Sequence, residues 1–198
     1  MKNYILIISI ITLAFLGCQP AAEQGVDPTG TWRVSFDLGE VSLPTMITIS
    51  ASGENQYTAS LVNGEETLDV ERVTQNGDTL SLRMAIFDTE MVGVINAEGK
   101  WEGTFTNYSR SKDYQIPFSA EKGLENRFRT QDSVAVNDIS GRWETYFSPD
   151  DAEGGSPGIG IFQQDGKNVK GTFLTETGDY RFLEGVAVGD SLKLSCFD

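Results

Sequence analysis

The sequence predicts an all-β protein made of two tandem antiparallel β-modules, the second of which is incomplete. Short runs of alternating apolar and polar residues recur about every ten positions, and Gly, Asn and Asp bound them. Helical periodicity is almost absent after residue 28. Two landmarks of the first half recur in the second half at nearly constant spacing. Many short strands at regular spacing are typical of a barrel or a sandwich, and the pattern leaves open which of the two forms.

The N-terminus has the pattern of an export signal over residues 1–17. One cation, Lys2, precedes an apolar run over residues 4–15, and Leu-Gly-Cys18 follows. The run is shorter than the ~20 residues that span a bilayer. Its end resembles the lipobox of bacterial lipoprotein signals, with Phe15 where Leu, Val or Ile is usual. The resemblance implies cleavage before Cys18, lipid attachment at Cys18, and a place in the cell envelope on the periplasmic or outer-membrane side. The alternative interpretations of residues 1–17 are an ordinary signal peptide and a buried helix.

Composition divides the rest of the chain into four parts. Residues 18–28 are rich in Pro, Gly and small polar side chains, which predicts a flexible tether. Alternating patterns then cover residues 29–120, the first module. Residues 121–138 are charged and alternate poorly, so we expect a linker before the second module at 139–198.

The first module is predicted to hold about eight strands. From Leu80 to Ile86 every second residue is apolar, which places these side chains on one buried face. Gly99 in AEGK and Gly166 in QDGK stand where a tight hairpin needs a positive φ. The expected strands of the first module are TWRVSFDL (31–38), TMITISAS (45–52), NQYTASLV (55–62), TLDVERV (67–73), DTLSLRMAIF (78–87), EMVGVIN (90–96), KWEGTFTN (100–107) and YQIPFSA (114–120).

A repeat relates the two modules. PTGTWRVSFD (28–37) matches ISGRWETYFS (139–148), and NGDTLSLRMAIFD (76–88) matches VGDSLKLSCFD (188–198). After Asp88 the first copy continues through three more expected strands, whereas the second copy has about five strands and no counterpart of these three. A module that stops there leaves an open sheet edge, so we expect the second module to be truncated at residue 198.

Each module opens with Gly-x-Trp, at Trp32 and at Trp143. This motif resembles the one that opens the first strand of lipocalin-like barrels, where the Trp closes the base of the barrel. The resemblance implies a lipocalin-like barrel and structural roles for Trp32 and Trp143. The alternative is a strand-entry Gly followed by a core Trp, which makes both residues structural as well.

Absent residue types exclude several chemistries. The chain has no His, which removes Ser/His and Cys/His nucleophile pairs and His-ligated zinc. Its net charge of −14 disfavours nucleic acid as a partner. No Gly-rich phosphate loop and no Cys-x-x-Cys is present. We therefore expect no catalytic residue, no metal and no cofactor within these residues.

Three groups of side chains are candidates for chemistry, and each has a simpler explanation. An acidic loop has ligands that calcium accepts, or is a solvated turn. Carboxylates at two hairpins have the groups for glycoside hydrolysis, or are ordinary hairpin charges. Aromatic side chains line a glycan or peptide surface, or reflect β-propensity. In this order the residues are Asp150, Asp151 and Glu153; Glu65, Glu66, Glu176 and Asp179; and Tyr108, Tyr114, Tyr146, Phe147 and Tyr180.

Cys196 is the remaining reactive side chain. Alternation places it with Leu192 and Leu194, and the repeat aligns it with Met84. A buried thiol behaves as a small hydrophobe with a raised pKa, so we expect Cys196 to face the core.

The signal, the tether and acidic modules with GTW…GDTLSL…FD and GRW…GDYRFLEGV…GDSLKLSCFD resemble one family over residues 18–198. It comprises the bacterial thiol–disulfide oxidoreductase lipoproteins of the redoxin/thioredoxin superfamily. The resemblance implies a membrane-anchored, non-catalytic N-terminal region, with the thioredoxin-fold domain and its Trp-Cys-x-x-Cys motif beyond residue 198. It also implies the membrane and envelope thiol–disulfide proteins as partners. The alternatives are a self-contained lipocalin-like ligand-binding lipoprotein and a carbohydrate-active or metal-binding surface protein.

Overall fold

The computed structural model describes residues 25–124, 126–129, 137–148, 150 and 154–197, so Cys18 and the predicted signal lie outside it. The described residues form antiparallel strands almost throughout, which confirms the all-β prediction. Among them a single short 3-10 helix, η1 (Ala85–Phe87), interrupts the strands. No helix in this part of the chain is long and apolar enough to cross a membrane.

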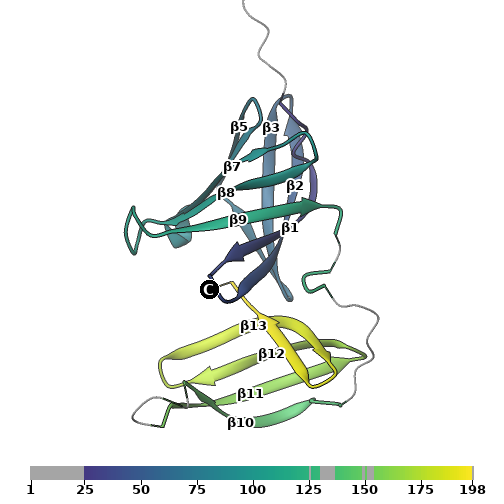
Figure 1. Ribbon diagram of the computed structural model, residues 1–198, viewed down its shortest axis with the longest axis vertical. Helices are drawn as coiled ribbons and strands as arrows, with labels where there is room; N and C mark the ends of the chain where they lie inside the picture. Colours follow the sequence, from purple (N-terminus) through teal and green to yellow (C-terminus); the bar gives the residue numbers. More distant parts are fainter. Residues whose placement is uncertain (1–24, 125, 130–136, 149, 151–153, 198) are drawn as a thin grey trace, which may run out of the picture.

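The first module is a nine-stranded sheet, sheet A, that curls into a nearly closed barrel (Figure 1). Its strand order is β4-β3-β2-β1-β9-β8-β7-β6-β5. The edge strands β4 and β5 follow each other in the chain, so the seam of the barrel lies at their connection. The strands are β1 (Gly30–Asp37), β2 (Ser42–Gly53), β3 (Gln56–Asn63), β4 (Glu66–Val70), β5 (Arg72–Asn76), β6 (Thr79–Met84), β7 (Thr89–Ile95), β8 (Lys100–Asn107) and β9 (Gln115–Lys122).

The second module is a five-stranded sheet, sheet B, that curls into a half-barrel in the order β10-β11-β12-β13-β14 (Figure 1). The expected number of strands is therefore confirmed for this module. Its strands are β10 (Gly141–Phe147), β11 (Ser156–Asp165), β12 (Asn168–Thr175), β13 (Gly178–Val188) and β14 (Ser191–Ser195).

The repeat seen in the sequence is also a repeat of strand pairing. Strands β10, β11, β12 and β14 correspond to β1, β2, β3 and β6, while the long β13 corresponds to β4 and β5 together. The first module thus has nine strands where we expected eight, because the TLDVERV segment breaks at Glu71. In cross-strand register, Trp32, Ile47 and Leu61 occupy the same places in sheet A as Trp143, Gly160 and Phe173 occupy in sheet B.

Both modules begin with the same local structure. Gly30 and Gly141 have φ values of 126° and 118°, a conformation that favours glycine. Each following Trp donates its indole N–H to the carbonyl oxygen four residues earlier, at 2.7 Å for Trp32 and 2.8 Å for Trp143. The Gly-x-Trp motif therefore recurs because the Gly allows the positive φ at the start of the strand and the Trp hydrogen-bonds to the backbone just before it.

An aspartate precedes each of these motifs and fixes the turn into the strand. The Asp27 carboxylate accepts hydrogen bonds from the Thr29 N–H and hydroxyl, both at 2.9 Å. The Asp138 carboxylate accepts one from the Ser140 N–H at 2.8 Å. The hydrogen bonds from Thr29 lower the pKa of Asp27, and the Ser140 hydroxyl together with the Ser140 N–H lowers the pKa of Asp138. The repeated unit is thus Asp-x-Ser/Thr-Gly-x-Trp, longer than the motif recognised in the sequence.

The barrel interior is filled by its own side chains. Trp32 packs edge-on against Trp101, with ring centroids 6.0 Å apart, and Phe36 packs similarly against Phe105 at 5.2 Å. The other buried residues of this core are Val34, Ile47, Ile49, Ala59, Leu61, Val70, Leu80, Leu82, Met84, Met91, Ile95, Phe118 and Ala120.

The alternating pattern predicted that Ile86 is buried, and this prediction is wrong. Leu80, Leu82 and Met84 do point into the barrel, but Ile86 is 79% exposed. Strand β6 ends at Met84, and the 3-10 helix that follows turns the chain before Ile86 can continue the pattern.

The core of the second module is small. Its buried members are Phe162, Val169, Leu183 and Ala187. Cys196 is partly buried and packs against this cluster on the same side as Leu194, as alternation indicated.

Candidate functional site

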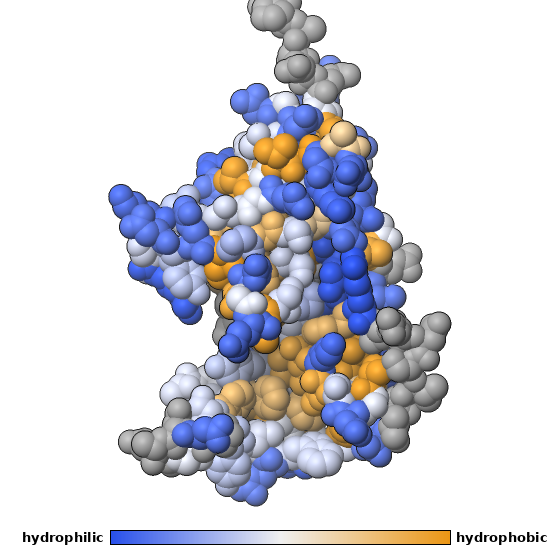
Figure 2. Space-filling model, viewed as in Figure 1, coloured by the Kyte–Doolittle hydropathy of each residue, from blue (hydrophilic) through white to orange (hydrophobic). Residues whose placement is uncertain are grey.

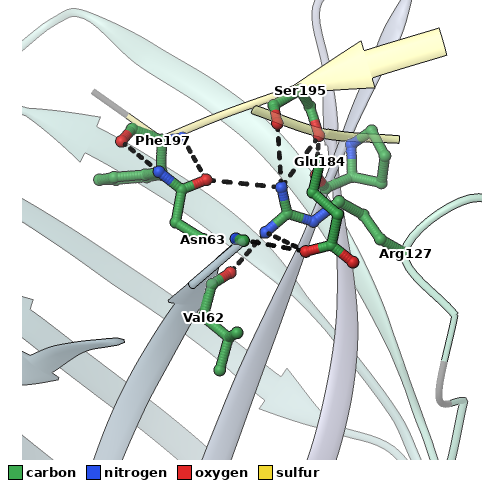
Figure 3. Close-up of polar contacts among 8 residues, drawn as sticks. Val62, Asn63, Arg127, Glu184, Ser195 and Phe197 are labelled. Carbon is green, nitrogen blue, oxygen red and sulfur yellow. Dashed lines mark hydrogen bonds and ion pairs between the residues drawn. The ribbon is translucent and has the colours of Figure 1, made fainter. Parts of the chain in front are cut away.

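Arg127, from the segment between the modules, is buried where sheet A meets sheet B (Figure 3). Its guanidinium donates to the backbone oxygen of Val62 and to the backbone oxygen and hydroxyl of Ser195, the latter two at 3.0 and 3.3 Å. An Nη2 to Oε2 distance of 3.8 Å pairs it with Glu184. Burial lowers the pKa of Arg127 below its ordinary value, and the nearby Glu184 carboxylate offsets this shift only in part. A guanidinium stays charged in proteins, so the junction contains a permanent buried cation.

Asn63, at the end of β3, holds the main chain of Phe197 with both ends of its amide (Figure 3). The amide N–H donates to the Phe197 oxygen at 3.1 Å, and the Phe197 N–H donates to the amide oxygen at 3.0 Å. Arg127 also donates to that amide oxygen, at 3.4 Å. The side chain thus replaces a strand partner and fastens the segment after β14 to the barrel. We call Asn63, Arg127, Glu184, Ser195 and Phe197 the latch.

The ring of Phe197 packs against the aromatic core at one end of the barrel. It lies edge-on to Phe87, with centroids 5.3 Å apart, and to Phe105 at 6.4 Å. Phe87 and Phe197 are the phenylalanines of the repeated Phe-Asp pairs, so the two copies of this motif meet at the junction.

Further polar contacts cross the junction around the latch. The Ser195 hydroxyl donates to the Pro44 oxygen at 3.1 Å, and the Gly64 N–H donates to Glu184 at 3.2 Å. The approach at Gly64 is close, because a Cβ there would lie 2.9 Å from a backbone oxygen of β13. The two modules therefore share buried hydrogen bonds instead of meeting through the linker alone.

An apolar cleft of about 630 Å3 lies beside the latch. Leu38 and Leu43, the η1 helix and the β8–β9 hairpin form its walls on the barrel side, and Tyr180 and Cys196 line it from sheet B. Arg110 stands on its lining, donates to the Tyr114 hydroxyl at 3.2 Å, and forms no ion pair with another described residue. The cleft combines apolar walls with the Arg110 guanidinium and the Asp88 carboxylate, and Asp88 is paired with Arg83.

The structure brings only some of the predicted aromatic residues together. Tyr114 and Tyr180 line the cleft, and Phe147 packs on Tyr180 with centroids 5.6 Å apart. Tyr108 donates to Glu90 and Tyr146 to Glu144, and each of these hydrogen bonds raises the pKa of its phenol. The five residues do not form one continuous aromatic platform.

The predicted acidic groups stay at hairpins. Glu65 and Glu66 flank the β3–β4 turn and Glu176 and Asp179 the β12–β13 turn, at corresponding places in the repeat. Glu65 forms an exposed ion pair with Lys170 at 3.1 Å. Asp151 and Glu153 lie outside the described residues, whereas Asp150 lies within them. No group of three or more potential metal ligands occurs among the described residues.

Comparison of the chain with protein-family models, with curated proteins and with solved structures finds no match.

Sequence reasoning missed the latch. Arg127 belongs to the charged stretch expected to be a linker, and Asn63 stands at a turn, where Asn is common. Only the repeated Phe-Asp pair, with Phe197 at its second copy, pointed to this part of the molecule.

Proposed function

We propose that this chain is the membrane-anchored, non-catalytic β-rich part of a cell-envelope thiol–disulfide oxidoreductase. Its two modules act as one support for a redox domain carried by the polypeptide that follows residue 198. The observation that carries this proposal is the latch, which fastens the end of β14 to the barrel.

The latch supports a fixed relation between the modules. Modules joined only by a flexible linker move relative to one another by default. Here a buried arginine donates hydrogen bonds to Val62 in sheet A and to Ser195 in sheet B, so the modules cannot separate without breaking buried charge-assisted hydrogen bonds. Polypeptide that continues from Phe197 therefore starts from a defined point on the barrel.

The opposite end of the barrel supports the role of a spacer. The Val26 N–H donates to Asp78 at 3.1 Å, and the Gln75 amide donates to the Val26 oxygen at 2.7 Å. These contacts tie the start of the described chain to the β5–β6 hairpin, at the end of the barrel away from sheet B (Figure 1). A lipid at Cys18 would attach at that end, with the redox domain beyond the other.

The lipid and the redox identity rest on the sequence. The signal that ends at Cys18 supports the anchor, and the resemblance of the repeated motifs supports the oxidoreductase family. Acyl groups on Cys18 in protein purified from membranes, identified by mass spectrometry, are the expected result for the anchor. The full-length protein should also reduce or oxidise disulfides in a substrate protein.

The support role is tested by the distance between the modules in the lipid-free chain. Spin labels at Glu54→Cys and Asp165→Cys, in a background with Cys18→Ala and Cys196→Ala, report this distance by pulsed electron resonance. We expect one narrow distribution, which broadens in Arg127→Ala and stays narrow in the control Arg129→Ala. A broad distribution in the parent protein contradicts the support role, whatever the redox assay shows.

The cleft favours a second function, a self-contained lipocalin-like ligand-binding lipoprotein. Since the barrel interior is filled, a ligand would bind beside the latch, where apolar walls and Arg110 suit a chain with an anionic head. Its volume of about 630 Å3 lies within the usual range for ligand pockets. Titration with a fluorescent fatty acid tests this function: saturable binding that weakens in Arg110→Gln supports it, and absence of binding excludes it for this ligand class.

A further inference from the structure

The inner face of sheet A shows what a complete module requires. Strands β7, β8 and β9 pair in sequence between β6 and β1, and they cover the face that β1, β2 and β3 form. Their inward side chains include Met91, Trp101, Phe105 and Phe118, all of them buried.

Sheet B presents the corresponding face without these strands among the described residues. Trp32 is 0% exposed in sheet A, and its counterpart Trp143 is 48% exposed in sheet B. Leu80 is 0% exposed, and its counterpart Leu192 is 44% exposed. The two members of each pair are the same residue type at equivalent places in the sheet. Their difference in exposed fraction therefore comes from strands β7, β8 and β9, which cover sheet A and have no counterpart in the described part of sheet B.

The uncovered face is apolar and continuous with the small core of sheet B. Figure 2 shows apolar side chains gathered in the hollow between the two modules, over the strands of sheet B. Exposed apolar area of this kind marks an interaction site. The residues that form this inner face are Trp143, Phe147, Phe173, Tyr180, Leu192 and Leu194.

The edges of sheet B indicate the kind of partner. Its edge strands are β10 and β14, whereas their counterparts β1 and β6 pair with β9 and β7 in sheet A. An edge strand offers a row of backbone donors and acceptors to an added strand. The partner must therefore hydrogen-bond to the backbone of both edge strands and also bury the apolar side chains of the inner face.

We infer that sheet B is completed by an antiparallel three-stranded segment that pairs with β10 and β14 and turns aromatic and aliphatic side chains inward, as β7, β8 and β9 do in sheet A. The segment belongs to the polypeptide that follows residue 198, and this assignment rests on the proposed function. Within this chain, the strands that complete sheet A follow β6 directly after a three-residue helix. Adding the segment would bury Trp143 as Trp32 is buried.

The three tryptophans of the chain allow a direct test. The lipid-free 198-residue chain and the full-length protein are labelled with 5-fluorotryptophan, and 19F NMR measures the solvent isotope shift of each resonance. The Trp143→Phe variant identifies the resonance of Trp143. We expect a large solvent shift for this resonance in the 198-residue chain, and its loss in the full-length protein.

Two variants separate completion of the sheet from a change elsewhere. Leu192→Asp places a charge on the inner face, and Ile161→Asp places one on the outer face at similar exposure, 39% against 44%. Both positions are exposed, so both variants of the 198-residue chain should fold. In the full-length protein, Leu192→Asp should restore the solvent shift of Trp143, and Ile161→Asp should not.

Two other outcomes overturn the inference. A Trp143 that stays solvent-exposed in the full-length protein shows that the face is not covered. A 198-residue chain that is dimeric by light scattering, with Trp143 already protected, shows that a second copy covers it. A full-length protein with Trp143 protected but without disulfide exchange leaves the inference standing and overturns only the redox role.

Discussion

At the scale of single residues, Arg127 is the side chain on which the junction depends most. Arg127→Ala leaves buried oxygens of Val62 and Ser195 without a donor, so we expect a loss of about 3 kcal/mol in the free energy of unfolding. Urea denaturation measures this loss. Arg129→Ala is the matched control, because Arg129 forms an exposed ion pair with Glu121 that contributes less than about 1 kcal/mol. Equal effects of the two substitutions would contradict a special role for Arg127.

Asp27 should give a pH-dependent contribution to stability. Hydrogen bonds from the N–H and hydroxyl of Thr29 lower the pKa of Asp27 below its ordinary value of 3.8. A carboxyl group whose pKa is lower in the folded state stabilises that state above its unfolded pKa, and this contribution is lost as pH falls through the folded pKa. Asp27→Asn should therefore be less stable than the parent protein near neutral pH, and the difference should shrink below pH 3.8. Urea midpoints across this range measure the difference, and a constant difference would argue against this origin.

At the scale of strands, close backbone packing depends on glycine at one crossing in sheet A. A Cβ at Gly103 in β8 would lie 2.0 Å from the Val92 oxygen and 2.4 Å from the Gly93 Cα. Gly103→Ala should therefore force the β7–β8 pair apart and cost about 2 kcal/mol of stability. In Gly53→Ala the new Cβ would meet only the flexible Gln56 side chain at 3.0 Å, so the change should stay within about 0.5 kcal/mol. Thermal unfolding of the two variants compares them, and similar losses would contradict the packing argument.

Alternation and the repeat predicted most of the strands. Successive side chains of a strand point to opposite faces, so a strand with one buried face has an apolar residue at every second position. Gly99 and Gly166 do have positive φ, as their turns required. The exposure of Ile86 was not predicted, since Ile86 continues the alternating pattern of β6. The β4–β5 break was also missed, although the apolar positions shift from even to odd numbers between Val70 and Val73.

The latch was beyond sequence reasoning for a physical reason. Asn63 and Ser195 gain their roles only when β3 and β14, more than a hundred residues apart in sequence, come together. A polar residue at a strand end is usually solvated, so its type alone does not distinguish a turn from a buried contact. The repeat predicted which strands correspond, but not how the two modules meet.

At the scale of the whole molecule, the two modules differ in how much of their stability they hold by themselves. Among the described residues, seventeen buried apolar side chains form the core of the barrel and four form that of sheet B. Apolar burial is the main favourable term in folding, so a core of four residues is too small to offset the conformational entropy of an isolated half-barrel. Sheet B therefore depends on the barrel through the latch.

Separate expression of the modules tests this dependence. Residues 18–130, without lipid, should unfold cooperatively in urea, because the barrel core lies entirely within them. Residues 131–198 should show no cooperative transition and rapid amide exchange, since they lack Asn63 and Arg127 and keep Trp143 in water. Tryptophan fluorescence and amide exchange followed by mass spectrometry measure both segments. A cooperative transition in the isolated 131–198 segment would mean that the half-barrel is stable without the latch, and the support role of the barrel would have to be abandoned.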